Sequence, residues 1–454
     1  MLLRKTLFLL LIQILSGWTS YAGGPKRVQE IRITDKTSEK NDADYRVSLG
    51  FPIVTKEGVF VERAAYLQDY QHDLSHHELY RYDFSSGETK KVCQINRSNI
   101  LYLHHQSAHT IGVGGVVVTI EGPSSLAGFS TTTGQRLWEL QGDNFHRLYE
   151  LPNGNVLYFR HPPGGPPYYC SHGSIVGVVD VKSGVTLWET DLKKLGYYDE
   201  RNSPPLFLMA SAYFTVNSNP VKLIILNTQT GQITAEITDP DNMGIAPFHL
   251  LGLENDILYT LSKVITAYSA TTFKKLWQSS ITLDALTIVS TESLFVVTTF
   301  GYSKGDNFFV LNKSDGKLIS SFGPNLTPGW ITSTGKMETN GSSVFFAADI
   351  YEPGTLKRRE CRLISVNIAL GTVEWSHRSE CVHMGPILEN NLLYIGTADG
   401  FLKAIDPKSG SVKWSLRVGE SPENKNEEYF LNRPIFQNGK LYTSSHEKLL
   451  IIDP

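Results

Sequence analysis

Histidine is the residue of this sequence best suited to bind a metal. Six of the 13 histidines gather in two segments, HDLSHHELY (72–80) and LYLHHQSAH (101–109). A metal site needs ligands that converge on one point and are held there by further contacts. Adjacent residues of a strand point to opposite faces of the sheet, so His104 and His105 could not both bind one metal from a strand. We therefore expect solvated or core histidines and no metal site.

Four cysteines suit an oxidising compartment but do not form a disulfide-dense scaffold. Cys361 and Cys381 flank one expected hairpin and are the candidate disulfide pair. The alternative is that both remain free thiols. Cys93 and Cys170 fall in different repeats, and we expect both to be buried free thiols. The sequence has no Ser-His-Asp signature, no glycine-rich phosphate loop and no HExxH motif, so we assign no catalytic residue and no cofactor-binding residue.

Tyrosines supply the candidate binding surface. Long segments interrupt the chain at 66–77, 161–173, 301–306 and 351–360. They carry the six partner-binding candidates Tyr66, Tyr70, Tyr168, Tyr169, Tyr302 and Tyr351. Tyrosine is enriched at protein interfaces, and loops on a rigid scaffold often carry binding. We expect a partner-binding face here, and variable decoration without a partner is the alternative.

A recurring nine-residue frame shows which elements must position these segments. The frame has a central glycine, with Asp, Asn or Ser four residues before it and often tryptophan four residues after it, as in DPKSGSVKW (406–414). Its centres are Gly87, Gly134, Gly184, Gly231, Gly316, Gly371 and Gly410, with Phe273 at the centre of one further copy. Five of the seven tryptophans, Trp138, Trp188, Trp277, Trp375 and Trp414, share the same offset. Repeats of about 40–50 residues are typical of propeller blades and solenoids.

The frame has the chemistry of a tight turn between antiparallel strands. Its Asp, Asn or Ser can accept hydrogen bonds from amides two or three residues on, and its glycine tolerates a positive φ. Short β-rich runs lie on both sides of each turn. The sequence therefore predicts a single all-β propeller of eight to nine four-stranded blades, with both counts open. We expect the five tryptophans to dock each blade on the next.

The end of the chain indicates how the ring closes. Residues 433–454, RPIFQNGKLYTSSHEKLLIIDP, contain three strands and lack the fourth. Many propellers close by pairing strands from the two termini, which removes exposed edges. We predict that VQEIRITD (28–35) supplies the missing strand.

The frames AIDPKSGSVKW and VVDVKSGVTLW resemble the repeat of the pyrroloquinoline-quinone-like propellers. That superfamily includes quinoprotein alcohol dehydrogenases and non-catalytic members such as the outer-membrane assembly lipoprotein BamB. The resemblance covers roughly residues 45–454 and implies the fold more strongly than the function. The enzymes typically use two adjacent cysteines against the quinone, a calcium ion and an aspartate base. No adjacent cysteines occur here, so we expect no cofactor, and quinone with calcium belongs only to the enzymatic alternative.

The amino terminus predicts export. Residues 1–22 read as a signal peptide, with Arg4 and Lys5 before an apolar run and small residues before Gly23. Trp18 stands where a lipoprotein carries its lipidated cysteine, so we expect no lipid anchor. Residues 23–44 are expected to be a mobile segment that contains the closing strand, and residues 45–454 the propeller. We expect no membrane span, and with a net charge of −3 and no basic stripe we expect no nucleic-acid partner.

These observations favour a secreted or periplasmic, non-catalytic scaffold that binds protein partners. If the source is bacterial, envelope assembly is the expected setting. The alternatives are a quinoprotein-type alcohol dehydrogenase with a degenerate site and a polysaccharide-active enzyme on the same ring.

Overall fold

The structure, a computed structural model, describes most of the expected propeller. The described residues are 25, 27–33, 45–50, 52–67, 76–95, 110–121, 125–142, 145–161, 175–196, 206–208, 211–216, 222–238, 249–261, 264–281, 285–299, 308–322, 330–333, 337–351, 358–379, 386–397, 399–418, 434–445 and 448–454. They form strands and turns without a helix. A search of the same residues for a helix able to cross a membrane found none.

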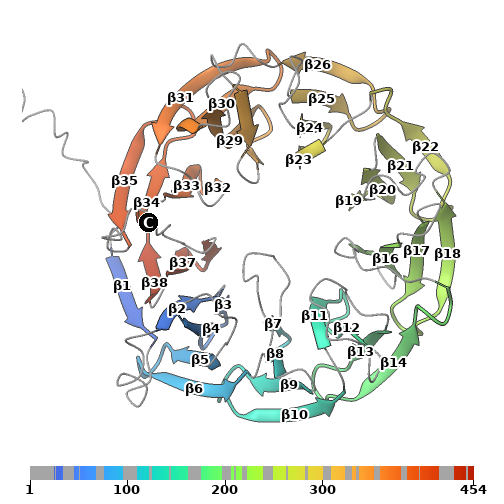
Figure 1. The fold of residues 1–454 in the computed structure, drawn as a ribbon, viewed down its shortest axis with the longest axis vertical. Helices are drawn as coiled ribbons and strands as arrows, with labels where there is room; N and C mark the ends of the chain where they lie inside the picture. Colours follow the sequence, from blue (N-terminus) through green and yellow to red (C-terminus); the bar gives the residue numbers. More distant parts are fainter. Residues whose placement is uncertain are drawn as a thin grey trace, which may run out of the picture.

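Within these residues the strands form nine antiparallel sheets arranged as a closed ring, as Figure 1 shows. We number the sheets as blades 1–9 in chain order. Nine lies within the predicted range of eight to nine blades.

Blade 1 contains β2 (Tyr45–Leu49), β3 (Ile53–Val54), β4 (Gly58–Leu67), β5 (His76–Asp83) and β6 (Thr89–Gln94). Blade 2 contains β7 (Thr110–Val113), β8 (Val116–Glu121), β9 (Ser125–Ser130) and β10 (Arg136–Gln141). Blade 3 contains β11 (Phe145–Glu150), β12 (Val156–Arg160), β13 (Ile175–Val179) and β14 (Thr186–Asp191).

Blade 4 contains β15 (Leu206–Leu208), β16 (Ser211–Val216), β17 (Lys222–Asn227) and β18 (Ile233–Thr238). Blade 5 contains β19 (His249–Glu254), β20 (Ile257–Leu261), β21 (Ile265–Ser269) and β22 (Lys275–Gln278). Blade 6 contains β23 (Ala285–Ser290), β24 (Leu294–Thr299), β25 (Phe308–Asn312) and β26 (Leu318–Phe322).

Blade 7 contains β27 (Trp330–Ser333), β28 (Glu338–Thr339), β29 (Ser343–Tyr351), β30 (Arg358–Asn367) and β31 (Thr372–Ser379). Blade 8 contains β32 (Ile387–Glu389), β33 (Leu392–Gly396), β34 (Phe401–Ile405) and β35 (Val412–Arg417). Blade 9 contains β36 (Ile435–Gln437), β37 (Lys440–Ser445), β38 (Lys448–Asp453) and, as its outer strand, β1 (Arg27–Arg32).

The pairing of β1 with β38 closes the ring. The two strands are antiparallel, with a register that runs from Arg27 opposite Asp453 to Arg32 opposite Lys448. An ion pair of 2.9 Å between Glu30 Oε2 and Lys448 Nζ crosses this junction. The predicted closure is confirmed, and the closing strand begins one residue earlier and ends three residues earlier than expected.

The core lies between the blades. Nine clusters of buried apolar side chains occur in the described chain, one at each contact between neighbouring blades. The cluster of blades 9 and 1 joins Tyr442 and Ile451 to Leu49 and Val61, so the closing contact is packed like the others. Because each sheet buries its faces only against its neighbours, the ring is stable as a whole.

The predicted turn chemistry is present between the third and fourth strands. In blade 1, Gly87 N donates to Asp83 O over 2.9 Å, and the Asp83 carboxylate accepts hydrogen bonds from the amides of Ser85 and Ser86. Gly87 has a φ of 70°, in the left-handed region that glycine enters without a steric penalty. Phe273 takes the same conformation, with a φ of 58°, which explains how one copy of the frame works without glycine.

Candidate functional site

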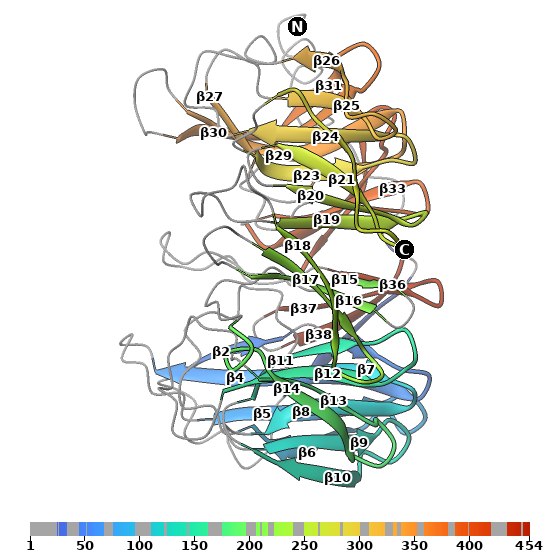
Figure 2. The same cartoon turned by 90° about the vertical axis from the view of Figure 1, so that its right-hand side faces the viewer.

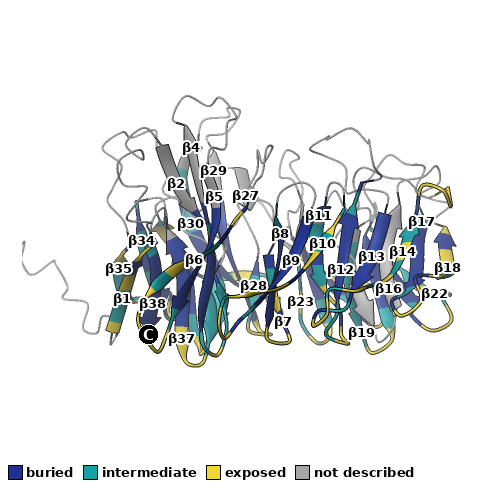
Figure 3. Cartoon of the chain, turned by 90° about the horizontal axis from the view of Figure 1, so that it is seen from below, coloured by how far each residue is buried: buried dark blue, intermediate teal, exposed yellow. Residues whose placement is uncertain are grey.

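The two faces of the ring carry different kinds of connection. The turns between first and second strands, and between third and fourth strands, leave one face, which we call the hairpin face. The connections between second and third strands, and from blade to blade, leave the opposite face, which we call the insertion face. Figure 3 shows the short turns together on one side of the ring. The predicted segments interrupt the chain between β4 and β5, β12 and β13, β24 and β25, and β29 and β30, as expected.

Blades 1 and 7 extend further toward the insertion face than their neighbours. β4 has 10 residues and β29 has nine, whereas the second strands of the neighbouring blades, β37, β8, β24 and β33, have six, six, six and five. Gly58 at the start of β4 pairs with Asp83 at the hairpin face, so the additional length lies at the other end. Figure 2 shows β4 and β30 reaching past the other blades on the same side.

Both tall blades have a divided first strand. β2 and β3 pair with successive parts of β4, and β27 and β28 pair with successive parts of β29. A divided inner strand gives the long second strand a partner along most of its length. Blades 8 and 9 lie between these two tall blades in the ring. The insertion face therefore has two raised walls with two ordinary blades between them.

A buried ionic cluster supports the wall of blade 1. Glu78 on β5 accepts hydrogen bonds from Tyr80 Oη (2.7 Å) and Lys91 Nζ (2.5 Å), and Arg63 Nη1 lies 3.6 Å from its Oε2. Arg63 and Glu78 are buried, with 1% and 7% of their surface exposed. A buried charge is tolerated when it is paired and hydrogen-bonded, so this cluster joins β4, β5 and β6 through one carboxylate.

Burial by itself would raise the pKa of Glu78. The hydrogen bonds from Lys91 and Tyr80 and the positive charges of Lys91 and Arg63 outweigh this effect, and the pKa lies below its usual 4.5. The carboxylate is therefore ionised at neutral pH.

The wall of blade 7 carries a cluster of charged side chains that is partly exposed to solvent. Glu360 Oε1 accepts a hydrogen bond of 2.8 Å from Arg362 Nε, and its Oε2 lies 3.9 Å from Arg378 Nε. Arg362 also donates to Ser376 Oγ over 3.2 Å. The side chain of Arg378 is 78% exposed, so this wall presents a basic side chain to solvent.

The predicted tyrosines fall at the edge of the described structure or beyond it. Tyr66 lies in β4 opposite Arg46, and Tyr351 ends β29 opposite Trp330, so both backbones stand on the raised walls. Tyr70, Tyr168, Tyr169 and Tyr302 lie outside the described residues. The proposal that the six tyrosines bind a partner stays a prediction.

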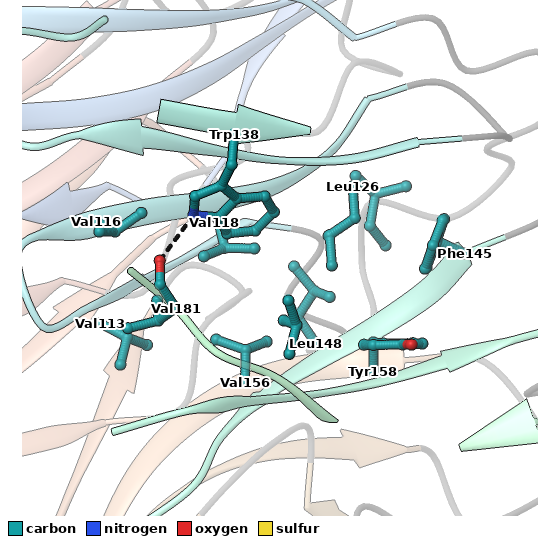
Figure 4. Close-up of a cluster of buried hydrophobic side chains, with 12 residues drawn as sticks. Val113, Val116, Val118, Leu126, Trp138, Phe145, Leu148, Val156, Tyr158 and Val181 are labelled. Carbon is teal, nitrogen blue, oxygen red and sulfur yellow. Dashed lines mark hydrogen bonds between the residues drawn. The ribbon is translucent and has the colours of Figure 1, made fainter. Parts of the chain in front are cut away.

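The predicted docking tryptophans lie at contacts between blades. Trp138 Nε1 donates to Val181 O of the next blade over 2.7 Å, as Figure 4 shows. Trp188 Nε1 donates to Thr228 O (2.8 Å), and Trp375 Nε1 donates to Pro407 O (2.9 Å). Each acceptor directly follows the Asp or Asn that begins the turn of the next blade.

Two of these indoles lack such a bond. Trp277 and Trp414 have buried Nε1 atoms with no acceptor among the described residues. Trp414 faces blade 9, whose outer strand β1 comes from elsewhere in the chain. The packing gives no reason for the missing hydrogen bond of either indole.

Between blades 1 and 2, an arginine makes the hydrogen bond that the indole makes elsewhere. Arg81 Nε donates to Thr131 O (3.1 Å), the carbonyl at the position equivalent to Val181, and Arg81 Nη2 donates to Thr132 O (2.8 Å). The guanidinium also pairs with Asp83 over 2.7 Å and lies 6.0 Å from the centre of the Phe60 ring. The sequence frame did not reveal this residue, because Arg81 lies on the third strand and not at the tryptophan position.

The described cysteines do not form a catalytic pair. Cys93, on the outer strand of blade 1, is a buried free thiol whose pKa is raised to about 12 by burial and by the charge of Glu121. Cys361 is buried in β30 of blade 7, and Cys381 lies outside the described residues, so their disulfide stays a prediction. The described cysteines do not fit the vicinal pair that a quinone site of the related enzymes uses. No group of three or more His, Cys, Asp or Glu side chains able to hold a metal occurs in this part of the chain.

A family model described as outer membrane protein assembly factor BamB matches residues 171–322 and 261–453, more than half of the chain. No curated protein matches at a significant level.

Among solved structures, BamB from Moraxella catarrhalis is similar over 76% of this chain and 93% of its own, with 12% identity and a TM-score of 0.49. Quinohemoprotein alcohol dehydrogenase from Comamonas testosteroni is similar over 76% and 74%, with 12% identity and a TM-score of 0.49. The computationally designed Ika8 protein is similar over 77% and 96%, with 14% identity and a TM-score of 0.49.

Proposed function

The chain belongs to the family described as outer membrane protein assembly factor BamB, and from this premise we propose that it is an exported, non-catalytic propeller that binds other proteins during bacterial envelope assembly. The family match over more than half of the chain is the observation that carries the proposal. A scaffold of this kind acts in the periplasm, which agrees with the signal sequence expected at residues 1–22.

The asymmetry of the ring supports the insertion face as the binding surface. A propeller that served only as a rigid spacer would need no difference between its blades. Here blades 1 and 7 are raised, and a buried ionic cluster of Arg63, Glu78 and Lys91 supports the wall of blade 1. The four segments that carry the six candidate tyrosines each connect a second strand to a third strand, so their strand ends lie on the same face. Rigid strands that hold tyrosine-bearing segments are a common design for protein recognition.

Paired substitutions of Tyr168 and Tyr169 test this surface. Replacing both with Ala removes two large aromatic contacts and should reduce the amount of native partner recovered by about tenfold or more. Replacing both with Phe keeps most of the aromatic area and should retain most of the capture. The measurement is cross-linking of the full chain in its own cells, with the captured protein identified by mass spectrometry and the melting temperature of each variant compared.

Equal recovery by the Ala and wild-type proteins would refute the binding role of this pair. Recovery of a partner unrelated to envelope assembly would refute the proposed setting. The enzymatic alternative has its own test, in which purified protein is supplied with pyrroloquinoline quinone and calcium. Saturable, dye-linked oxidation of an alcohol would overturn the non-catalytic assignment.

A further inference from the structure

An open depression lies on the hairpin face, opposite the proposed binding surface. A cavity of about 550 Å³ opens between the inner hairpins of blades 5, 6 and 7. Its lining consists of Glu254 from blade 5, residues 290–293 from blade 6, and Thr339 and Gly341 from blade 7. We call it the Glu254 cavity. Nothing in the proposed function requires it.

A buried lysine fixes one wall of the cavity. Lys313 Nζ donates to Glu254 Oε2 and to Thr291 O, each over 2.6 Å, and only 5% of its side chain is exposed. The ammonium lies 5.7 Å and 5.1 Å from the ring centres of Tyr259 and Phe295. A buried ammonium is costly to desolvate, so its partners hold it in one position. Glu254 is thereby tethered at the cavity wall while its side chain stays 41% exposed.

No other described turn buries a charge in this way. Lys313 occupies the position that directly follows the first residue of the turn between third and fourth strands. The other blades place uncharged residues there, namely Phe84, Thr131, Val181, Thr228, Ala270, Ile368 and Pro407. The lysine is therefore specific to the wall of this cavity and is not a general requirement of the repeat.

The cavity keeps acceptor groups that the fold itself does not use. Thr291 Oγ1 accepts from the amides of Ser293 and Leu294, and Thr339 Oγ1 donates to Ser343 O, so these two hydroxyls serve their turns. In the described part of the chain Lys313 contacts Glu254 through Oε2, which leaves Oε1 for a ligand.

Charge then indicates which ligands fit. Glu292 is exposed at the tip of its turn, as are the hydroxyl-bearing Ser290 and Ser293. Two carboxylates against one ammonium leave one net negative charge beside these hydroxyls. Such a site attracts a single cationic group that can also donate hydrogen bonds.

We propose that the Glu254 cavity binds an ammonium or guanidinium group, carried by a small polyamine or by a lysine or arginine side chain of a peptide. Glu254 and Glu292 supply charge-assisted hydrogen bonds, and the serine hydroxyls accept the remaining protons. A metal ion fits less well, because hard cations such as calcium take six to eight oxygen ligands.

Blade 8 offers a matched control. The segment ILENNLLY (387–394) repeats the pattern of GLENDILY (252–259), with Glu389 in the position of Glu254 and turn residues of positive φ after each. Blade 9, which follows blade 8, has no turn in the position of Lys313, and Glu389 does not line the cavity. Glu389→Gln therefore removes an equivalent charge away from the proposed site.

Calorimetric titration of the purified full chain tests the proposal with two probes, spermidine and N-acetyl-arginine amide. We expect saturable binding of at least one probe, weakened about tenfold by either Glu254→Gln or Glu292→Gln and unchanged by Glu389→Gln. Glu292 is exposed, so its substitution reports on binding even if Glu254→Gln impairs folding.

The stronger of the two probes identifies the source of the cationic group. Absence of binding by both, or equal weakening by Glu389→Gln, would overturn the proposal. Displacement of the bound probe by an equal concentration of calcium would assign the cavity to a metal and would overturn it too. None of these results bears on capture of a partner at the insertion face.

Discussion

The glycine of the repeated turn is required for two independent reasons. Gly184 has a φ of 72°, and a Cβ added to it would lie 2.6 Å from the Trp138 ring of the preceding blade. Gly231 has the same relation to Trp188, and Gly316 to Trp277. A Cβ atom at this position is therefore disfavoured both by the turn conformation and by the contact between blades. This explains why glycine and tryptophan recur together in the sequence.

Alanine at Gly184 should separate these two reasons. The left-handed conformation alone costs about 1–2 kcal/mol for a residue with a Cβ, and displacement of the Trp138 ring adds about 1–3 kcal/mol. Gly154→Ala is the control, because Gly154 has a φ of 78° and no atom within 4 Å of an added Cβ. Chemical denaturation should show a larger loss of unfolding free energy for Gly184→Ala. Equal losses for the two variants would show that the ring contact contributes nothing.

Some side chains at the blade contacts can be located from the sequence, and others cannot. The tryptophan frame locates Trp138, Trp188 and Trp375 because these residues share one offset from a glycine. Arg81 donates to an equivalent carbonyl from a different strand, so no offset could reveal it. The burial of Lys313 could not be predicted either, because a lysine beside a turn is usually exposed.

The raised walls depend on strands longer than the repeat requires. β4 and β30 each have 10 residues, and the first strand of blade 1 is divided into β2 and β3. The repeat predicts four strands in each blade and where the insertions fall. It does not predict strand extension, because the residues beyond the usual blade are held by contacts such as that between the facing residues Arg63 and Glu78, which are not part of the repeated frame.

Replacement of Glu78 by Gln tests what supports the wall of blade 1. Its pKa is below the usual 4.5 in the folded protein, so the ionised carboxylate stabilises the fold above that pH, and the contribution is lost as the pH falls below it. Glu78→Gln should cost about 1.5–3 kcal/mol at neutral pH and should flatten the loss of stability in acid.

The control is Glu88→Gln, at an exposed pair with Lys90, which should change stability by less than about 1 kcal/mol. The measurement is the denaturation midpoint as a function of pH. A Glu78→Gln protein with the same acid profile as the wild type would contradict the assigned role.

The whole molecule is a ring in which each blade is stabilised by its two neighbours. The sequence predicts its class, its repeat and its closure, because turn residues, tryptophans and strand periodicity are local signals. It left eight and nine blades open, and the sheet topology gives nine in the described chain. The Glu254 cavity was beyond prediction, since it depends on three neighbouring hairpins that only the closed ring brings together.

Closure of this ring by β1 is the claim on which both faces depend, and a cross-link between Arg27→Cys and Asp453→Cys tests it most directly. The two residues are opposite each other in the β1–β38 register. Oxidation should give an intramolecular disulfide, so that a chain nicked once by protease stays joined until it is reduced. The pairing of Arg27→Cys with Lys408→Cys, on the turn of blade 8, should not. Failure of the first pair to cross-link, or equal cross-linking by the second, would contradict the closed nine-bladed ring.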